Sequence, residues 1–369
     1  MSVLRRLYRG ETDFDFIGRR RWGYLFSLAL LVAGGIALLT NGLDLGIEFE
    51  GGISWEVSAE DVSVSDARDA LAEVGLRDAK IQTVGGETIR VQAGEEFIER
   101  SREVTELLAD LAGAEPADVS VNEVGPSWGE EISSKAQRAL VYFLVAITLY
   151  ISLRFEWRMA LAALVTVAHD ILVTVGIYAL FGFEVTPATV VAFLTILGFS
   201  LYDTIVVFDK VQENVNLAGP GGRVTYSDVV NLSMNEVFMR SINTSVTAIL
   251  PVLSILVVGG NLLGAVTLQE FAIALLVGML VGVYSSIFIA SPILATLKER
   301  EPRYAQARRR AVAAGGRSGL TPSGTATLPG DALPEAEEPE PEAARPRPTA
   351  GPAPYRQGPP RGRKKRRKR

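Results

Sequence analysis

The sequence contains no cysteine and only one histidine, and these absences exclude several kinds of site. Without cysteine the chain forms no disulfides, offers no thiolate to a metal and has no thiol nucleophile. His169 alone cannot build a histidine-rich metal site. We therefore expect neither a bound metal nor another cofactor, and no enzymatic activity that depends on one.

Long apolar runs, in contrast, are abundant in this 369-residue chain, 48% of which is hydrophobic. About 20 apolar residues in a helix cross the roughly 30 Å hydrocarbon core of a membrane. Six segments meet this criterion: Trp22–Thr40, Ala139–Leu153, Met159–Phe181, Pro187–Phe208, Ser241–Val258 and Phe271–Leu294. The first follows three arginines, as a signal peptide does, but it lacks a small-residue cleavage site and five more spans follow. We interpret it as an uncleaved membrane anchor.

Basic residues predict how the six spans are oriented, since Lys and Arg accumulate in short cytoplasmic loops. The loops 182–186 and 259–264 contain no basic residue and are therefore expected outside. The expected cytoplasmic residues are Arg5, Arg6, Arg9, Arg19, Arg20, Arg21, Arg154, Arg158, Lys210, Arg223 and Arg240. This distribution predicts a multi-pass membrane protein with both termini in the cytoplasm.

The segment 43–135 is then expected outside the cytoplasm, between spans one and two. It carries 22 acidic and seven basic side chains, which disfavours nucleic acid as a partner. Its pattern predicts a strand over 47–57 with a bulge or turn at Gly51-Gly52, a helix from Ser63, a hairpin around Gly85-Gly86, a helix over 97–111 and a strand over 119–124. The order β-α-β-β-α-β is typical of a ferredoxin-like α+β domain.

The expected layout is thus a polytopic α-helical membrane protein with one external domain. Its parts are a cytoplasmic segment 1–21, helix one over 22–42, the external domain 43–135, helices two to six over 136–297 and a tail 298–369. The tail holds 12 of the 18 prolines and 18 basic against eight acidic residues, so we expect it to be disordered. Its basic end favours anionic lipid or the ribosome surface as a partner, or serves only as a solvated anchor.

Three groups of polar residues lie inside the predicted spans, where ionisable side chains are rare and usually face a bundle interior. Asp203 shares a helical face with Ser200 and Thr204, and His169-Asp170 lies halfway along span three. Arg240 opens span five, with Asn243, Thr244 and Thr247 continuing its face. Arg240 is alternatively a headgroup anchor, and Asp170 an interhelical hydrogen-bond clamp.

Two further residue types concern helix packing. Gly278 and Gly282 in span six form a small-xxx-small pattern that allows close helix contact, although glycine also occurs there without such a role. Pro251 is expected to kink span five, because it cannot donate a backbone hydrogen bond.

Several stretches resemble the SecF family, the smaller membrane subunits of the bacterial SecDF protein-export complex in the RND superfamily. The resemblance covers about Arg19 to Leu297, keeps motif order and spacing, and leaves the tail uncovered. It is carried by Gly46-Ile-Glu-Phe-Glu-Gly-Gly52, Val124-Gly-Pro-Ser-Trp-Gly129, Ala168-His-Asp170, Gly198-Phe-Ser-Leu-Tyr-Asp-Thr-Ile-Val-Val-Phe-Asp209, Ser241-Ile-Asn-Thr-Ser245 and Tyr284-Ser-Ser-Ile-Phe-Ile-Ala-Ser-Pro292. In the first motif, many family members have Asp-Phe-Thr or Asp-Phe-Lys in place of Glu-Phe-Glu.

The resemblance implies an RND-type half that pairs with SecD and uses the proton gradient, or sodium in some relatives, in late steps of preprotein translocation. It assigns Asp203 to ion conduction and Arg240 as its basic partner, with His169 and Asp170 as further relay candidates. The implied partners are SecD, the SecYEG channel with SecA, preproteins and a YajC-like accessory subunit.

Three other functions fit parts of the sequence. A small-molecule RND exporter subunit would share the six spans but normally carries a second large external insertion. A passive scaffold for SecD would use its buried charges only structurally. An intramembrane aspartyl protease would use Asp170 and Asp203 as a dyad, but no Gly-x-Gly-Asp pattern is present.

Overall fold

The structure is a computed structural model. It describes residues 14–59, 62–77, 79–84, 88–218, 225–302, 304–306, 309, 319–320 and 326–327. Within these residues, six helices are long and apolar enough to cross a membrane, which confirms the predicted number of spans. The expected polytopic fold with a small sheet-containing domain is present.

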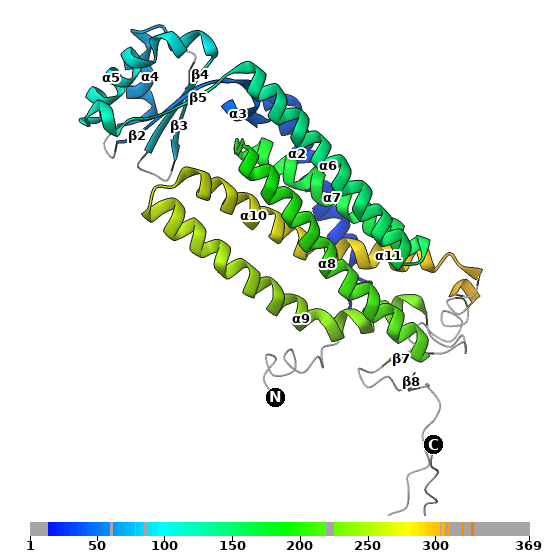
Figure 1. The fold of residues 1–369 in the computed structure, drawn as a ribbon. Helices are drawn as coiled ribbons and strands as arrows, with labels where there is room; N and C mark the ends of the chain where they lie inside the picture. Colours follow the sequence, from blue (N-terminus) through cyan, green and yellow to red (C-terminus); the bar gives the residue numbers. More distant parts are fainter. Residues whose placement is uncertain are drawn as a thin grey trace, which may run out of the picture. The chain divides into compact units, whose positions relative to one another are not determined.

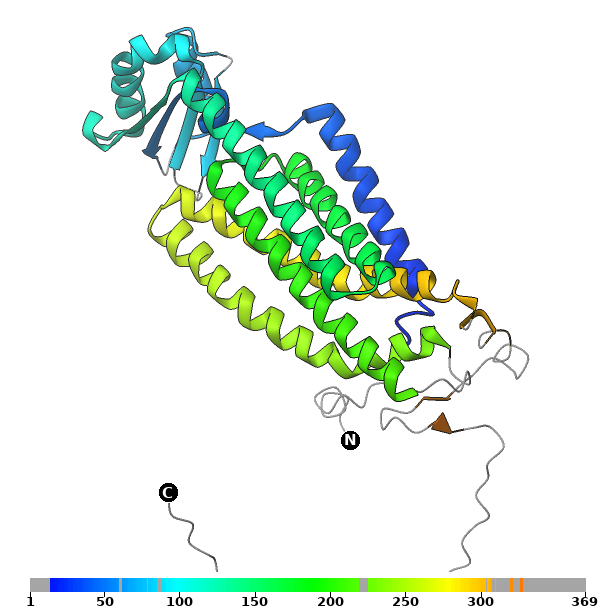
Figure 2. The same cartoon turned by 45° about the vertical axis from the view of Figure 1, so that its right-hand side comes forward.

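The six helices run side by side in one bundle, with the sheet domain at one end (Figures 1 and 2). Most are longer than the apolar runs that predict them, because polar residues at their ends remain helical outside the hydrocarbon. The third span, α7, matches its prediction most closely, since Gly182 ends it in the left-handed conformation. Their bounds are α2 Arg20–Asn41, α6 Pro126–Arg154, α7 Trp157–Phe181, α8 Pro187–Ala218, α9 Tyr226–Ser254 and α10 Val266–Ser285.

The last two spans each change to π-helical geometry, which hydropathy did not predict. Helix α9 continues as the π segment η3 (Ile255–Leu262), four residues beyond Pro251. Helix α10 continues through the π segment η4 (Ser286–Ala290) into α11 (Ser291–Lys298). Within η4, the Ser291 hydroxyl donates to the Ser286 carbonyl at 3.1 Å. Such wide turns are frequent at functional sites, and η4 borders the polar residues described below.

The sheet domain, for which the name external domain is kept from the prediction, has the predicted β-α-β-β-α-β order, with its sheet arranged β3-β4-β2-β5. The end of the bundle next to this domain is called its outer end. All three strand pairings are antiparallel, and helices α4 and α5 pack on one sheet face around Trp55, Leu71 and Leu108. A capping box between Ser63 and Asp66 begins α4. The bounds are β2 Gly52–Ser58, α4 Val64–Ala72, β3 Lys80–Val84, β4 Thr88–Ala93, η1 Glu95–Arg100, α5 Ser101–Ala112, η2 Pro116–Asp118 and β5 Ser120–Val124.

The strand predicted over 47–57 is wrong in its first part. Residues Ile47–Glu50 form one helical turn, α3, and the strand begins only at Gly52. Gly51 and Gly52 have φ of 82° and 128°, values that glycine adopts readily and that turn the chain between the two elements. Helix α3 packs against α6, where a Cβ on Gly129 would lie 2.9 Å from the Phe49 carbonyl. Tertiary packing therefore overrides the alternating pattern. The second predicted helix likewise begins as the 3₁₀ helix η1, and the predicted hairpin turn Gly85-Gly86 lies outside the described residues.

The second face of the sheet rests on the helical bundle. Ser54, Arg90 and Gln92 point away from α4 and α5, and all three are buried. Beside this face, strand β1 (Asp44–Leu45) pairs in parallel with β6 (Glu184–Val185), which connects α7 to α8. The chain leaving the first span is thus joined directly to the loop between the third and fourth spans.

The boundary of the tail, predicted at residue 298, lies further along the chain. Lys298 is buried and forms ion pairs with Glu156 and Glu301, the latter at 3.1 Å. The Tyr304 ring packs on Tyr226 with a centroid distance of 4.9 Å. The short strands β7 (Gly319–Leu320) and β8 (Ala326–Thr327) also pair. The prediction for residues 328–369 lies outside the described part of the chain.

Candidate functional site

A chain of polar contacts crosses the interior of the bundle through four helices. On α7, His169 and Asp170 contact each other, with 3.1 Å between Nδ1 and Oδ1. The Ser200 hydroxyl on α8 donates to the other Asp170 oxygen at 2.5 Å. His169 Nε2 lies 2.9 Å from the Ser27 hydroxyl on α2, which is 3.0 Å from the Tyr284 hydroxyl on α10. Predicted residues on α7 and α8 are therefore brought together, with two partners that sequence reasoning missed.

The directions of these hydrogen bonds determine where protons lie. Tyr284 uses its single hydroxyl proton to donate to the Gly23 carbonyl at 2.6 Å, so it accepts from Ser27. Ser27 then has no proton left for His169 and accepts one from His169 Nε2. Nδ1 of the same ring is then the atom that contacts Asp170 Oδ1.

Asp203 is buried on α8, the helix that also carries Ser200, and its side chain contacts α9 instead of α7. Its Oδ1 accepts a 2.8 Å hydrogen bond from Ser241 on α9, whereas Oδ2 has no hydrogen-bond partner among the described residues. Thr204 contacts Ser286 in η4 at 3.0 Å, and Ser286 donates to the Ser200 carbonyl at 3.3 Å. One turn of α8 thus faces α7, α9 and η4 simultaneously.

Arg240 forms no ion pair with Asp203 among the described residues. Its side chain is exposed, as are Asn243 and Thr247 on the same face of α9, while Thr244 is half-buried. Thr247 bonds back to the carbonyls of Asn243 and Thr244, each at 2.9 Å. The predicted Asp203–Arg240 partnership is therefore not a direct contact within this chain. Ser241, the neighbour of Arg240 and a member of a family-like motif, contacts Asp203 instead.

The predicted glycines lie where α10 approaches α8 at this site. A Cβ on Gly278 would lie 2.5 Å from Ile196, and one on Gly282 would lie 2.8 Å from the Ser200 Cβ. Gly34 and Gly176 bring α2 and α7 together in the same way, with 2.6 Å from a Cβ on Gly34 to the Gly176 Cα. The second pair was not predicted, because its members are far apart in sequence.

A second buried cluster lies between the external domain and the bundle, and sequence reasoning missed it. Arg90 on β4 bonds Glu56 on β2 through Nε at 2.8 Å, and through Nη1 bonds Glu184 on β6 at 2.8 Å and Glu270 on α10 at 2.5 Å. Gln92 donates to the other Glu184 oxygen at 2.6 Å. Burial alone would lower the pKa of Arg90, but the carboxylates of Glu270, Glu184 and Glu56 hold it above its usual value.

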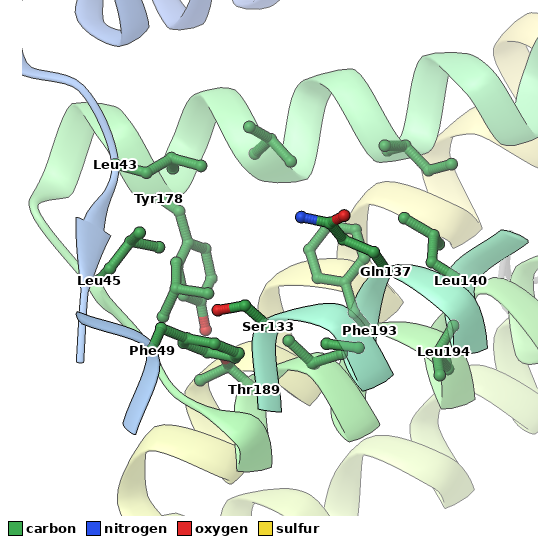
Figure 3. Close-up of a pocket in the computed structure, with 15 residues that line it drawn as sticks. Leu43, Leu45, Phe49, Ser133, Gln137, Leu140, Tyr178, Thr189, Phe193 and Leu194 are labelled. Atoms are coloured by element: carbon green, nitrogen blue, oxygen red, sulfur yellow. The ribbon is translucent and has the colours of Figure 1, made fainter. Parts of the chain in front are cut away.

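An apolar pocket of about 380 Å³ lies beneath the β1–β6 ladder, between the outer parts of α6, α7 and α8 (Figure 3). Leu45, Phe49, Tyr178 and Phe193 line it, with Ser133, Gln137 and Thr189 as its polar members. This lining contains no ionisable carboxylate or basic group, so the pocket is not an ion site. In the described part of the chain, no group of three His, Asp or Glu residues is arranged to hold a metal ion.

Comparisons with known proteins agree with this architecture. The family model described as "Protein export membrane protein SecD/SecF, C-terminal" matches residues 103–300. The chain is 39% identical over 336 residues to a protein translocase subunit SecF of Streptomyces coelicolor, covering 91% of this chain and 90% of that protein. It is 40% identical over 310 residues to the corresponding subunit of Mycobacterium tuberculosis H37Rv, covering 81% and 70%.

A solved structure shares the fold as well. The crystal structure of SecDF from Thermus thermophilus, a translocon-associated membrane protein, superposes with a TM-score of 0.71 at 34% sequence identity. The match covers 79% of this chain and 39% of that one, so this chain spans about two fifths of the solved SecDF chain.

Proposed function

This chain belongs to the SecF family of protein translocase subunits, and we propose that it works with a SecD-type subunit to drive late preprotein translocation with the proton motive force. The observation that carries this proposal is Asp203, a buried carboxyl inside a membrane span that keeps one oxygen without a partner. An ionised carboxylate there is costly, and protonation of the free oxygen removes that cost.

The partner is supported by the exposed polar face of α9. Arg240, Asn243, Thr247 and Ser254 follow one another at helical spacing, and all are exposed in this chain. Facing lipid, such a stripe would be costly, whereas a second membrane subunit can cover it with polar groups. On α8, the exposed Tyr202 lies next to Asp203. A SecD-type subunit on this side would bring its own groups to Arg240, the neighbour of the Ser241 that bonds Asp203.

In the proposed cycle, a proton from the outer side forms an O–H bond on Asp203, and this bond breaks toward the cytoplasm. When Asp203 gains the proton, it loses the negative charge that the Ser241 hydrogen bond stabilises and that attracts the positive charge of Arg240. The His169–Asp170 pair contacts Ser200, which lies on the same face of α8 as Asp203, and would take part in the same movement. The helix contacts at Gly278 and Gly282 convert these changes into movement of α8 against α10.

The remaining assignments follow from this role. We place the protein in the bacterial cytoplasmic membrane with both termini in the cytoplasm, so that the external domain meets emerging preproteins. Its further partners would be SecYEG with SecA and a YajC-like subunit, and anionic lipid at the basic end of the tail. The coupling ion in this proposal is a proton, because protonation of Asp203 would remove its charge inside the membrane span.

The test is Asp203→Asn in a strain that lacks the native subunit, with export of a reporter preprotein followed over time. The proposal expects loss of the stimulation that depends on the proton motive force, while the variant remains in the membrane. Asp209→Asn, an exposed carboxylate paired with Arg154 at 2.9 Å, is the matched control and should export normally. Normal, force-dependent export by Asp203→Asn would instead support a passive scaffold.

A small-molecule exporter is separated from this function by co-purification. The proposal expects a SecD-type chain and the export channel to purify with this protein. The protease alternative is not supported by the geometry, since Asp170 and Asp203 have different hydrogen-bond partners on different helices.

A further inference from the structure

The Arg90 cluster connects the external domain to α8 and α10, two helices that pack closely at Ser200, one turn before Asp203. Glu184 lies three residues before α8, whose first turn is closed by a 2.9 Å hydrogen bond from the Thr186 backbone to Thr189. Glu270 lies near the start of α10, the helix that packs against α8 through Gly278 and Gly282. Any shift of α8 relative to α10 therefore moves two carboxylates that share one guanidinium nitrogen.

The polar part of the attachment lies in this cluster, in addition to the packing of α3 on α6. Two donor atoms, Arg90 Nη1 and Gln92 Nε2, make three hydrogen bonds to Glu184 and Glu270, and the Arg90 side chain is only 8% exposed. Partly buried charge pairs are strong when both members are charged and become destabilising when one member loses its partner. The apolar pocket lies directly under the β1–β6 ladder, so side chains of the bundle do not fill the space behind Leu45 and Val185.

The cluster also contains more acids than bases. One guanidinium faces the three carboxylates of Glu56, Glu184 and Glu270, and Glu48 on α3 lies close enough to influence them. The other charged or titratable groups that surround these acids are Asp44 on β1 with its partner Lys80 on β3, and Tyr178 on α7. Because negative charges predominate, a proton can be accepted here without leaving Arg90 unpaired.

We propose that Arg90, Glu184 and Glu270 form a latch that couples α8 and α10 to the external domain, and that protonation of Glu270 from the outer side loosens it. Protonation of Glu270 leaves Arg90 paired with Glu184 and with Glu56, so the domain shifts against α10 without losing its own fold. This inference rests on the proposed function and extends it. Movement of the helices near Asp203 is transmitted to the domain that meets the preprotein.

The absence of cysteine makes the test direct, since two introduced cysteines can be labelled selectively. Spin labels at Asp69→Cys on the external domain and Leu180→Cys near the outer end of α7 report the distance between domain and bundle in the purified full chain. Both positions are exposed. At about pH 7.5 we expect one distance population. At about pH 5, closer to the range where glutamates titrate, we expect a second population above about 10% of molecules.

Arg90→Gln should show the second population already at about pH 7.5. Glu270→Gln, which keeps the side-chain shape, should show it as well and should reduce its dependence on pH; this variant decides the question if Arg90→Gln does not fold. Arg100→Gln, which removes contacts with Glu103 and the Val74 carbonyl inside the same domain and none with the bundle among the described residues, is the control and should behave as the parent.

A single distance population that is unchanged by pH and by both cluster variants would overturn the latch. The outcome is independent of the export assay, because the distance is measured in the isolated chain. A failed latch with a positive Asp203→Asn result would leave the proposed function in place. If the second distance population is present but the Asp203→Asn variant exports normally, the latch is supported and the proposed function is not.

Discussion

The cluster inside the bundle and the cluster at its outer end are both polar and largely buried. Their carboxylates, however, have different kinds of hydrogen-bond partner. At the outer end, Glu184 and Glu270 share the Arg90 guanidinium. Inside the bundle, Asp170 and Asp203 contact hydroxyls and one histidine, and no lysine or arginine pairs with either among the described residues. The difference indicates that the outer acids hold structure together through charge, whereas the inner acids depend on protons or on a second subunit.

An apolar layer separates the two clusters. Ile196, Leu275 and Met279 belong to a buried core between them, and Tyr178 borders this layer at the outer end. The contacts of the described residues form no continuous hydrogen-bonded route through it. Communication between the clusters must therefore use helix movement, for which the close contact of Gly278 with Ile196 provides a sensitive point.

The largest effect is expected from Gly282→Val, which disturbs the inner cluster alone. The new side chain would press on Ser200, moving its hydroxyl from Asp170, and should lower the free energy of unfolding by about 1–3 kcal/mol. Thermal unfolding in detergent measures the change, and export should fall with it. Gly198→Val, at a glycine with nothing within 4 Å of its Cβ position, is the matched control. Equal stability of the two variants would contradict the close packing.

A smaller effect is expected from Ser241→Ala, which removes the hydrogen bond to Asp203. Asp203 Oδ1 loses its donor but no side chain is overpacked, so we expect a smaller loss of stability than at Gly282. The lost hydrogen bond also acts on the charge of the carboxyl. We expect a shift in the pH dependence of export with normal membrane insertion. Ser245→Ala, whose hydroxyl bonds only to the Ser241 carbonyl, should leave that pH dependence unchanged. If both variants behave alike, the hydroxyl of Ser241 has no special role.

The smallest effect is expected from Glu48→Gln at the edge of the outer cluster. Burial raises the pKa of Glu48 in the folded protein. Its contribution to stability is therefore fully present below the unfolded pKa and is lost as the pH rises through the folded one. The variant should lose this part of the pH dependence and become slightly more stable than the parent near neutral pH. Melting temperatures from about pH 4 to pH 8 test this, with the exposed Glu50→Gln as control.

The spans and the external domain were predictable, because each depends on local pattern. Long apolar runs with few charges predicted six spans, and the strand and helix order predicted the four-stranded sheet. The failure at Ile47–Glu50 has a tertiary cause: the alternating pattern fits a strand, but contact with α6 and two glycines with positive φ favour a helical turn.

The candidate site was predictable only in part. The spacing of Ser200, Asp203 and Thr204 placed them on one turn of a helix, but it could not reveal that this turn faces three different neighbours. Ser27 gave no signal, because a serine in an apolar span is common and its partner His169 is 142 residues away. Arg240 was expected to reach Asp203, and the folded chain instead presents it on the exposed side of α9.

The sequence by itself determined which segments enter the membrane and which acidic residues these segments contain. Hydrophobic transfer is a local property of a segment, so composition alone decides it. Only the tertiary structure decided what each acid meets there. Arg90 lies 94 residues from Glu184 and 180 from Glu270. Such contacts depend on how helices and sheet pack together, and a buried charge takes its energy from those neighbours rather than from its own segment.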